Sequence, residues 1–378
     1  MRRMIYFFLS QAAFCAGAYA QGQEGLPGRG SPQALPDISV TGVIDGHISD
    51  DNGDADRNKL EFREIETAFQ DYLYPEIKAD VFLALHKHDA GYDGEICEAK
   101  VSFLRLAPGL SAEAGKVTVE FGKLNKSHSH TRAMIDQPAA LTNFLGEHAF
   151  NPQGAALKYL LPLPFYAQLQ GGAWQGNKHD HPVDGESTAE VLDTDLNTVS
   201  VVLAPGESGE FFPADKIYTG RFNTAFQLSA GTELEIGTSF LSGKGAHFEE
   251  HKDRMKLAGA DITLKLWPSA YRRLTLQGEY FHLARSVPAG ELKRDGLYVL
   301  ADYRLSRYWE LGARFDYAEN AFPAVTFERD YSLIVTRRLT ETTSVRAQYK
   351  YRDLSGDKAN EGWLQLVFGL GPHTHELE

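Results

Sequence analysis

The chain has 378 residues and a formal net charge of −13. Its length allows one large domain or two ordinary ones. The acidic balance argues against a nucleic-acid partner, because nucleic acid is held through basic surfaces. With two cysteines in the whole sequence, a disulfide framework is also excluded.

The first predicted element is a secretory signal peptide over residues 1–20. Arg2 and Arg3 precede a mostly apolar run, and Ala18-Tyr19-Ala20 is a small-x-small cleavage site. Its removal leaves Cys97 as the only cysteine of the mature chain, so no internal disulfide is expected. Residues 21–37, rich in Gly and Pro, are expected to form a flexible periplasmic leader. No later segment approaches the roughly 18 consecutive apolar residues of a transmembrane helix.

Apolar and polar residues alternate along almost all of the remaining sequence. In WELGARFDYAEN, Trp309, Leu311 and Ala313 share one face, whereas Glu310 and Arg314 lie on the other. Such alternation indicates a β-strand, because successive side chains of a strand point to opposite sides. Sixteen strands are predicted in this way. Their approximate ranges are 38–49, 59–73, 76–88, 96–107, 111–124, 153–163, 165–176, 217–229, 231–242, 256–267, 273–285, 293–305, 308–319, 326–339, 342–353 and 361–370.

The links between the predicted strands alternate between short and long. Only a few residues follow each even-numbered strand, whereas about 28 residues precede the sixth strand and about 40 precede the eighth. This asymmetry is typical of bacterial outer-membrane barrels, and an even strand count leaves both termini on the short-turn, periplasmic side. The sequence therefore predicts an all-β fold, a transmembrane antiparallel up-and-down β-barrel over residues 38–371 with a periplasmic tail at 372–378. The alternative is a soluble all-β protein, which keeps its polar faces outside.

Two further patterns favour a barrel in the outer membrane of a Gram-negative bacterium. Aromatic residues gather near both ends of the strands, as in the interfacial girdles of such barrels. Those near the short turns are Tyr72, Tyr74, Phe165, Tyr166, Trp267, Tyr271, Tyr308 and Trp309, and those toward the long loops are Trp174, Phe240, Tyr280, Tyr317 and Tyr351. The last strand, GWLQLVFGL, has one apolar face and is similar to the C-terminal signal for barrel insertion. The expected partners are outer-membrane lipid, lipopolysaccharide, the barrel-insertion machinery and further copies of the chain in a homo-oligomer.

Sixteen strands enclose a lumen wide enough for water and small solutes. The charged residues predicted to line this pore are of both signs: Arg304, Arg314, Arg346, Lys350, Arg352, Glu64, Glu66, Glu279, Asp302, Glu310 and Asp316. About 17 residues separate the signal peptide from the first strand, too few for a plug domain. The leading hypothesis is therefore a porin-like channel for passive diffusion of small hydrophilic solutes or ions, with no required cofactor. The loops at 125–152 and 177–216 are candidates to fold inward as a constriction, and mutual pairing of the charges is the alternative interpretation of the lumen.

Histidine pairs are the strongest candidate for a binding site. Four His-x-His pairs occur, where composition alone predicts about half a pair. Residues i and i+2 of an extended chain point the same way, and neutral imidazole suits zinc, copper and nickel. The candidate metal ligands at the outer ends of strands and in the outer loops are His86, His88, His128, His130, His148, His179 and His181. They suggest an alternative function, binding or uptake of a divalent transition metal such as zinc, while a polar loop surface remains the competing interpretation.

Several stretches are similar to a group of bacterial outer-membrane proteins. They are GKVTVEFGKLNKSHSHTRAMIDQPAALTNFLGEH at 115–148, LLPLPFYAQL at 160–169 and GPHTHE at 371–376. On these motifs the chain resembles porin-type barrels related to phosphate-selective porins, and a group labelled zinc-regulated outer-membrane receptors. The resemblance implies a porin-like barrel and a link to zinc. The energy-coupled part of the receptor label does not suit a chain without a plug domain.

A third hypothesis is an outer-membrane barrel enzyme such as a phospholipase or a protease. Ser127 and Ser129 stand near histidines and Asp136, as a nucleophile system requires. Neither their order nor their spacing matches a recognisable catalytic arrangement. No catalytic residues are therefore assigned, and the chain is expected not to be an enzyme.

Overall fold

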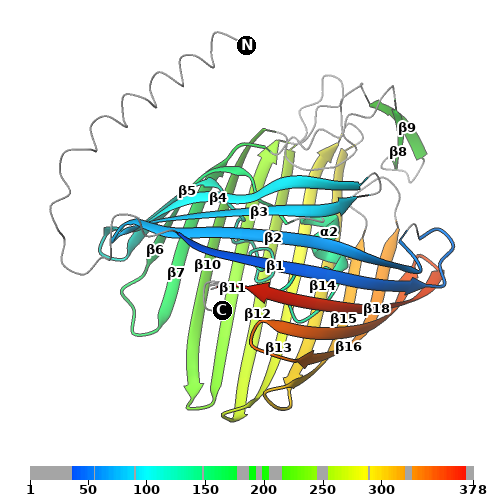
Figure 1. The fold of residues 1–378 in the computed structure, drawn as a ribbon. Coiled ribbons are helices and arrows are strands. Elements are labelled where there is room, and N and C mark those ends of the chain that lie inside the picture. The colour runs from blue at the N-terminus through cyan, green and yellow to red at the C-terminus, as the bar shows by residue number, and fades with distance from the viewer. Residues whose placement is uncertain are drawn as a thin grey trace. The chain divides into compact units, whose positions relative to one another are not determined.

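The computed structural model describes residues 36–54, 56–88, 91–146, 149–176, 187–192, 198–203, 215–244, 254–287, 290–319 and 326–371. Sixteen antiparallel strands in these ranges form one closed barrel, in the order β1-β18-β17-β16-β15-β14-β13-β12-β11-β10-β7-β6-β5-β4-β3-β2 (Figure 1). The first and last strands close it, with Val40 opposite Leu370 and Ser49 opposite Glu361. The predicted fold class and strand number are thus confirmed. The predicted signal peptide, most of the leader and the tail at 372–378 lie outside the described residues.

The barrel strands have these bounds: β1 Asp37–Ser49, β2 Lys59–Tyr74, β3 Ile77–His88, β4 Gly91–Ala107, β5 Leu110–Lys116, β6 Gln153–Leu160, β7 Tyr166–Trp174, β10 Asp215–Ser229, β11 Thr232–Lys244, β12 Arg254–Ser269, β13 Arg272–Val287, β14 Gly290–Arg304, β15 Trp309–Glu319, β16 Phe327–Arg338, β17 Thr343–Leu354 and β18 Asp357–Leu370. A separate two-stranded sheet pairs β8 (Ser187–Leu192) with β9 (Thr198–Leu203) in a region predicted to be loop. A short helix, α2, spans Ala139–Leu145. No helix among the described residues is long and apolar enough to cross a membrane.

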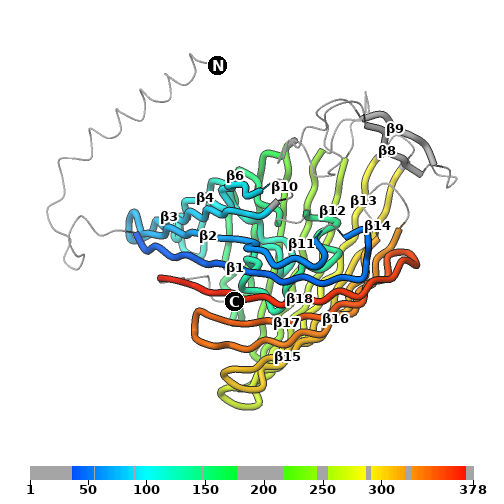
Figure 2. The backbone as a smooth tube through the Cα atoms, turned by 45° about the vertical axis from the view of Figure 1, so that its right-hand side comes forward, coloured from blue at the N-terminus to red at the C-terminus, as the bar shows by residue number. Residues whose placement is uncertain are grey.

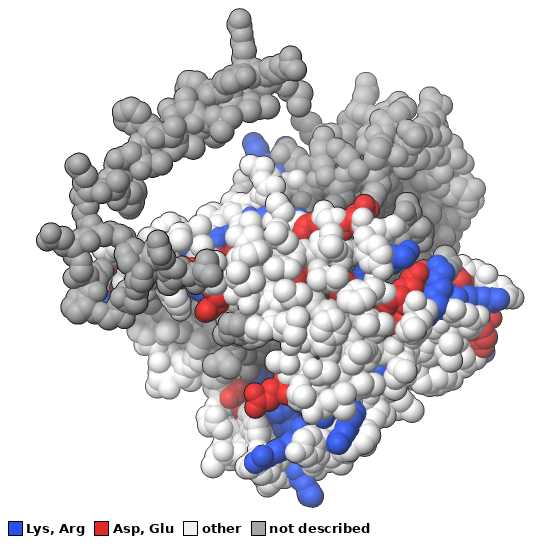
Figure 3. All heavy atoms as spheres, viewed as in Figure 1, with Lys and Arg blue, Asp and Glu red and all other residues white. Residues whose placement is uncertain are grey.

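Apolar side chains lie on the outer face of the barrel wall and polar side chains on its inner face, which is the reverse of a soluble protein. On β16, Tyr331 and Leu333 are 53% and 62% exposed, whereas Asp330 and Ser332 between them are 1% and 2% exposed. Successive strand residues point to opposite faces, so the apolar face is the outer one. Uncharged residues make up most of the surface drawn in Figure 3, and charged residues of both signs gather toward its right-hand side and near its lower edge. This distribution excludes the soluble all-β alternative, because such a protein buries its apolar faces.

The aromatic residues predicted near the short turns are all exposed there, from Trp267 at 37% to Tyr74 at 62%. The prediction for the other rim is wrong at Trp174, which is 3% exposed. Its indole Nε1 donates a hydrogen bond to Thr219 Oγ1 at 2.8 Å on the neighbouring strand β10. Trp174 shares the inward face of β7 with Gln170, because the two are four residues apart on one strand.

Several strand ends differ from the predicted ones. β4 begins five residues earlier than predicted and β18 four residues earlier, because residues 91–95 still pair with β3 and residues 357–360 still pair with β17. β5 ends at Lys116 instead of residue 124. Residues 117–124 leave the wall and enter the barrel, where Figure 1 shows α2 behind β2. Figure 2 shows β1 and β18 side by side where the barrel closes. We call residues 117–152 the inner loop; its residues 147–148 are not described.

Candidate functional site

The inner loop departs from the wall at a glycine. Gly115 has φ +136°, and a Cβ at this position would lie 2.1 Å from the carbonyl oxygen of Ala99 on β4. Only glycine tolerates both the backbone conformation and this close approach. Directly after it, Val117 N–H donates to Pro152 O at 3.1 Å and Val119 N–H donates to Phe150 O at 2.9 Å. These bonds bring the two ends of the loop together beside the wall.

The buried side chain of Asn125 completes this base. Its Nδ2 donates to the carbonyl oxygens of Val119 at 2.7 Å and Phe150 at 3.2 Å, and its Oδ1 accepts the Phe150 N–H at 2.9 Å. Asn125 is 1% exposed, so these bonds satisfy backbone groups that water does not reach. The loop therefore has a fixed conformation at its root.

One side of the inner loop packs against the wall through apolar contacts. The buried cluster joins loop residues Val117, Val119, Phe121, Leu124, Met134, Leu141, Phe144, Leu145 and Phe150 to wall residues such as Leu241, Leu257, Phe281, Tyr298 and Ile334. Helix α2 contacts β14 and β15. Gly296 of β14 makes room for it, because a Cβ there would lie 2.7 Å from Phe144 Cε2 and 2.8 Å from Ala140 Cβ. Close-packed contacts of this kind hold one position and resist deformation.

Glu279 of β13 receives the turn that follows Phe121. Its two carboxylate oxygens accept the N–H groups of Lys123 and Leu124 at 2.9 Å each, and Oε1 also accepts the Tyr298 hydroxyl at 2.6 Å. Gly122 has φ +64°, and its N–H donates to Ser239 Oγ at 3.0 Å. The turn thus presents consecutive N–H groups to one buried carboxylate.

The far end of the loop is held by Asp136. Its carboxylate lies 2.9 Å from a guanidinium nitrogen of Arg314 and 3.2 Å from Lys350 Nζ, and it accepts a hydrogen bond from Gln348 Nε2. Gln348 Oε1 in turn accepts the Ile135 N–H at 2.8 Å. Burial disfavours the charged carboxylate, but Arg314 and Lys350 outweigh burial and hold the pKa of Asp136 well below its usual range.

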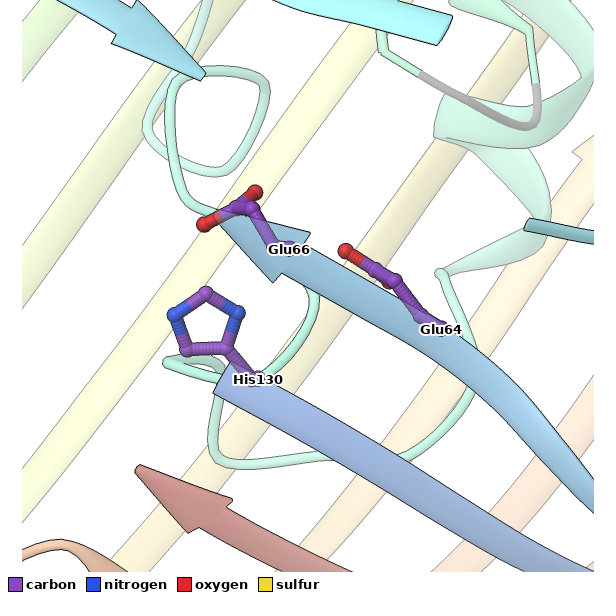
Figure 4. Close-up of side chains that lie close together, drawn as sticks. All are labelled: Glu64, Glu66 and His130. Carbon is purple, nitrogen blue, oxygen red and sulfur yellow. The ribbon is translucent and has the colours of Figure 1, made fainter. Parts of the chain in front are cut away.

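The opposite side of the loop faces β2 through ionisable groups. His128 Nδ1 lies 2.8 Å from Glu66 Oε2, and Ser129 Oγ donates to Glu64 Oε2 at 2.9 Å. His130 completes a group with these two glutamates, in which one ligand atom from each residue lies within 4.8 Å of the others. Figure 4 shows Glu64 and Glu66 projecting from β2 toward the imidazole of His130. These three residues therefore meet the first requirement of a metal centre, convergence of donor atoms.

Buried carboxylates surround His128 on this side of the loop. Glu64 and Glu66 are 7% and 2% exposed. Burial lowers the pKa of His128, but the hydrogen bond and charge of Glu66, together with the charges of Glu98 and Glu64, raise it overall. On the loop itself, burial and then the nearby charge of Arg63 lower the pKa of Arg132 to about 10. The loop therefore presents His128 to carboxylates of the wall, whereas Arg132 lies near the wall cation Arg63.

Three cavities surround the inner loop. The loop-end cavity has a volume of about 560 Å³ and is lined by Glu64, Glu66, Lys350 and Arg352, among others. Two further cavities lie toward the short turns. The first, of about 410 Å³, includes Arg346, Asp302 and Glu310, and the second, of about 800 Å³, includes Glu113, Arg221 and Asp261. Ser127 lines all three, and Lys126 and His128 line both the loop-end cavity and the second turn-end cavity. Residues 126–132 therefore stand between the space on one side of the loop and the space on the other.

The eleven residues predicted to line the pore have two kinds of position. Eight lie at cavity walls or at ion pairs between strands: Glu64, Glu66, Asp302, Glu310, Arg346, Lys350 and Arg352 border the cavities named above, and Arg304 is the eighth. Arg304 pairs with Glu310, at 2.5 Å. The remaining three, Glu279, Arg314 and Asp316, lie beneath the inner loop; Arg314 Nε donates to Asp316 Oδ2 at 2.7 Å. Their predicted role in a pore stays a prediction.

The predicted metal ligands are only partly brought together. The ring centroids of His128 and His130 lie 5.6 Å apart, inside the barrel instead of in an exposed outer loop. His86 lies elsewhere on the wall, 3.7 Å from Cys97 Sγ and 4.0 Å from Glu95. The side chains of His88, His148, His179 and His181 lie outside the described residues. The partners of the histidine pair are therefore glutamates of β2, which the sequence had suggested only as pore-lining groups.

Sequence reasoning missed Glu98, Gln348 and Arg132. Glu98 accepts the Thr118 N–H at 2.7 Å, and Arg132 Nε donates to Ser127 O at 3.0 Å. Strand parity gives a signal for one of them, because Gln348 shares its face of β17 with Arg346 and Lys350. Which wall residues meet the loop depends on its path through the barrel, which the alternation pattern does not encode.

The sequence was compared with protein families and with individual proteins. No family model matches the sequence. An uncharacterized protein of Aquifex aeolicus (strain VF5) is 24% identical over 376 residues, covering 90% of this chain and 75% of that protein.

Solved structures of outer-membrane porins are similar over nearly the whole chain. Salmonella typhi OmpF in complex with daunomycin superposes with a TM-score of 0.57 at 9% identity, covering 88% of this chain and 97% of OmpF. The anion-selective porin from Comamonas acidovorans gives 0.56 at 10% identity, covering 88% and 99%. The outer-membrane channel DcaP of Acinetobacter baumannii gives 0.53 at 11% identity, covering 91% and 100%. The chain therefore has the fold of outer-membrane porins, while the zinc-receptor part of the sequence resemblance stays a prediction.

Proposed function

We propose that this protein is an outer-membrane channel through which small hydrophilic solutes or ions diffuse passively. The observation that carries the proposal is the pair of spaces on either side of the inner loop, with Ser127 lining the cavities of both. A loop folded into a polar lumen narrows a passage without closing the barrel, as a solute filter requires. The likeness to porins in fold supports the same location and class of function.

The charges around the loop determine what such a channel favours. The loop-end cavity is lined by carboxylates at Glu64, Glu66, Glu328 and Asp330 and by cations at Lys350 and Arg352. The first turn-end cavity carries Arg273, Arg338 and Arg346 against Asp302 and Glu310. Both signs occur in each space, so we expect weak selection by charge and stronger selection by size.

The test is ion conductance of the purified, folded protein in planar lipid bilayers. We expect stepwise current increments in potassium chloride. Under a salt gradient the reversal potential should lie close to zero, as it does for a channel that selects weakly by charge. A protein that inserts without conducting contradicts the proposal. A lipase or peptidase assay on the same preparation separates the channel from the barrel-enzyme hypothesis, in which Ser129 would need a free hydroxyl although it donates to Glu64.

A further inference from the structure

The strongest unexplained feature of the lumen is the convergence of Glu64, Glu66 and His130 inside the barrel. Glu64 and Glu66 are two residues apart on β2, so both carboxylates point inward from one strand. His130 reaches them from the inner loop, and one ligand atom of each residue lies within 4.8 Å of the other two. Glu66 and Glu64 also hold the loop through His128 and Ser129, but those contacts do not account for the imidazole of His130 beside both carboxylates.

A second observation points to a ligand at this place. Glu66 is 2% exposed, and among the described residues its Oε1 is buried without a hydrogen-bond partner. Its other oxygen is engaged by His128 at 2.8 Å. A buried carboxylate oxygen without a partner is unfavourable unless something binds it. Glu66 belongs to the same three-residue group, so this oxygen is a candidate ligand atom for a cation there.

We propose that Glu64, Glu66 and His130 bind one divalent first-row transition-metal ion, for which zinc is the probe, at the side of the inner loop. Two carboxylates and one imidazole provide three protein ligands of the kind zinc accepts, and leave a further position for water. Bonds of about 2.0–2.2 Å place tetrahedral ligand atoms roughly 3.3–3.5 Å apart, so modest side-chain rotations bring the present group into bonding distance. The two negative charges of the glutamates balance the charge of the ion.

The surroundings suit this role. His128 and Ser129 each bind one oxygen of a ligating glutamate, at 2.8 Å and 2.9 Å. Hydrogen bonds of this kind orient ligating carboxylates and are part of most metal centres. An oxygen-only cage would favour magnesium or calcium, whereas the imidazole shifts the preference toward zinc and its neighbours.

The position of the site predicts an effect on transport. Glu64 and Glu66 line the loop-end cavity, whereas His130 lines the first turn-end cavity. An ion bound by all three residues ties the loop to β2 between these spaces. Zinc is therefore expected to reduce conductance. The binding itself does not depend on the proposed channel, whereas this effect does.

The binding test is zinc titration by calorimetry on the folded, full-length mature protein in detergent. Wild-type protein is expected to bind one ion that Glu66→Gln and His130→Ala lose, with affinity at that site reduced at least about 100-fold, because even groups that only orient ligands contribute about 10–100-fold. Glu98→Gln is the matched control for the first variant, since Glu98 is also a buried glutamate, 4% exposed, on β4, which is separated from β2 by β3. His282→Ala is the control for the second, since His282 pairs with Asp295 at 2.8 Å on β13 and β14. Both controls are expected to retain the ion.

Location and function have separate readouts. Anomalous diffraction at the zinc edge is expected to show a peak within bonding distance of Glu64, Glu66 and His130. Equal zinc binding by wild-type, Glu66→Gln and His130→Ala proteins, or a peak only at other histidines, overturns the site. His130→Ala removes a loop side chain, so it remains informative if Glu66→Gln does not fold. If the barrel never conducts, the channel proposal fails while the calorimetry still decides the metal site.

Discussion

Asp136 offers the sharpest test of how the inner loop is held. Asp136→Ala removes a carboxylate that contacts Arg314 at 2.9 Å, Lys350 at 3.2 Å and Gln348. Removing one partner of a buried ion pair costs about 3–5 kcal/mol. The cost here is smaller, because Arg314 keeps Asp316 at 2.7 Å and Lys350 keeps Glu361 at 3.1 Å. We therefore expect a loss of about 2–3 kcal/mol in the free energy of docking this part of the loop, at or just below the lower limit of that range.

Hydrogen exchange at the Ile135 amide measures this quantity, because its N–H is bonded to Gln348 on the wall. Exchange limited by local opening reports the opening free energy, so Asp136→Ala is expected to exchange roughly 30- to 140-fold faster. Glu310→Ala is the control, since Glu310 pairs with Arg304 and Arg338 of the wall. An unchanged Ile135 rate in Asp136→Ala, or an equal acceleration in the control, refutes the reasoning.

The same ion pair has a defined pH dependence. The pKa of Asp136 is lowered in the folded protein, where Arg314 and Lys350 outweigh the effect of burial. A carboxylate whose pKa is lowered on folding stabilises the folded state fully at pH values above its unfolded pKa, which is near 3.9 for Asp. This stabilisation is lost as the pH falls below that unfolded pKa toward the folded one. After correction for intrinsic exchange rates, the difference in opening free energy at the Ile135 amide between wild type and Asp136→Ala should be constant near neutral pH. It should narrow below about pH 4.

Three further substitutions probe the root, turn and helix of the loop. Gly122→Ala should destabilise the turn by about 1–2 kcal/mol through its left-handed backbone alone. The new Cβ would also lie 1.9 Å from Glu279 Oε2, so hydrogen exchange at the Lys123 and Leu124 amides should accelerate. Asn125→Ala leaves Phe150 N–H and Val119 O without their buried partner and should lower the free energy of unfolding by about 1–3 kcal/mol. A wild-type free energy of unfolding in denaturant titration counts against this account. Gly296→Val should destabilise by about 1–3 kcal/mol in thermal unfolding because its side chain collides with α2, whereas Gly171→Val, with no described atom within 4 Å of the new Cβ, should not.

The wall was predictable because membrane and lumen impose opposite demands on alternate residues. Leu333 faces outward and Ser332 inward, and one residue of slip would exchange them. This constraint repeats on every strand, so the number of strands and the inward set, including Glu64 and Arg346, follow from parity. Strand ends are less constrained. At the start of β4, residues such as Tyr92 and Asp93 still pair with β3 although the sequence there resembles a loop.

The path of the inner loop was not predictable from the same pattern. Val117, Val119 and Phe121 alternate as in a strand, but they pack on the loop's own cluster and against the wall instead of facing lipid. Gly115 was the only local sign of a departure, and a lone glycine in a strand has several explanations. The pairing of His128 with Glu66 joins residues 62 positions apart, so its partner follows from the loop's path and not from nearby residues.

The two sides of the inner loop differ in how firmly they are held, and this difference indicates where the width of a passage can change. Toward β13–β15 the loop is fixed by close-packed apolar side chains such as Phe144 and Phe281, which leave little freedom to shift. Toward β2 it is held by single polar contacts, His128 to Glu66 and Ser129 to Glu64, and it borders open cavities. A change in charge or a bound ion therefore acts on the β2 side, where contacts are few and ionisable. Solute passage and metal binding consequently compete for the same few residues, and zinc sensitivity of the current is the expected sign of that competition.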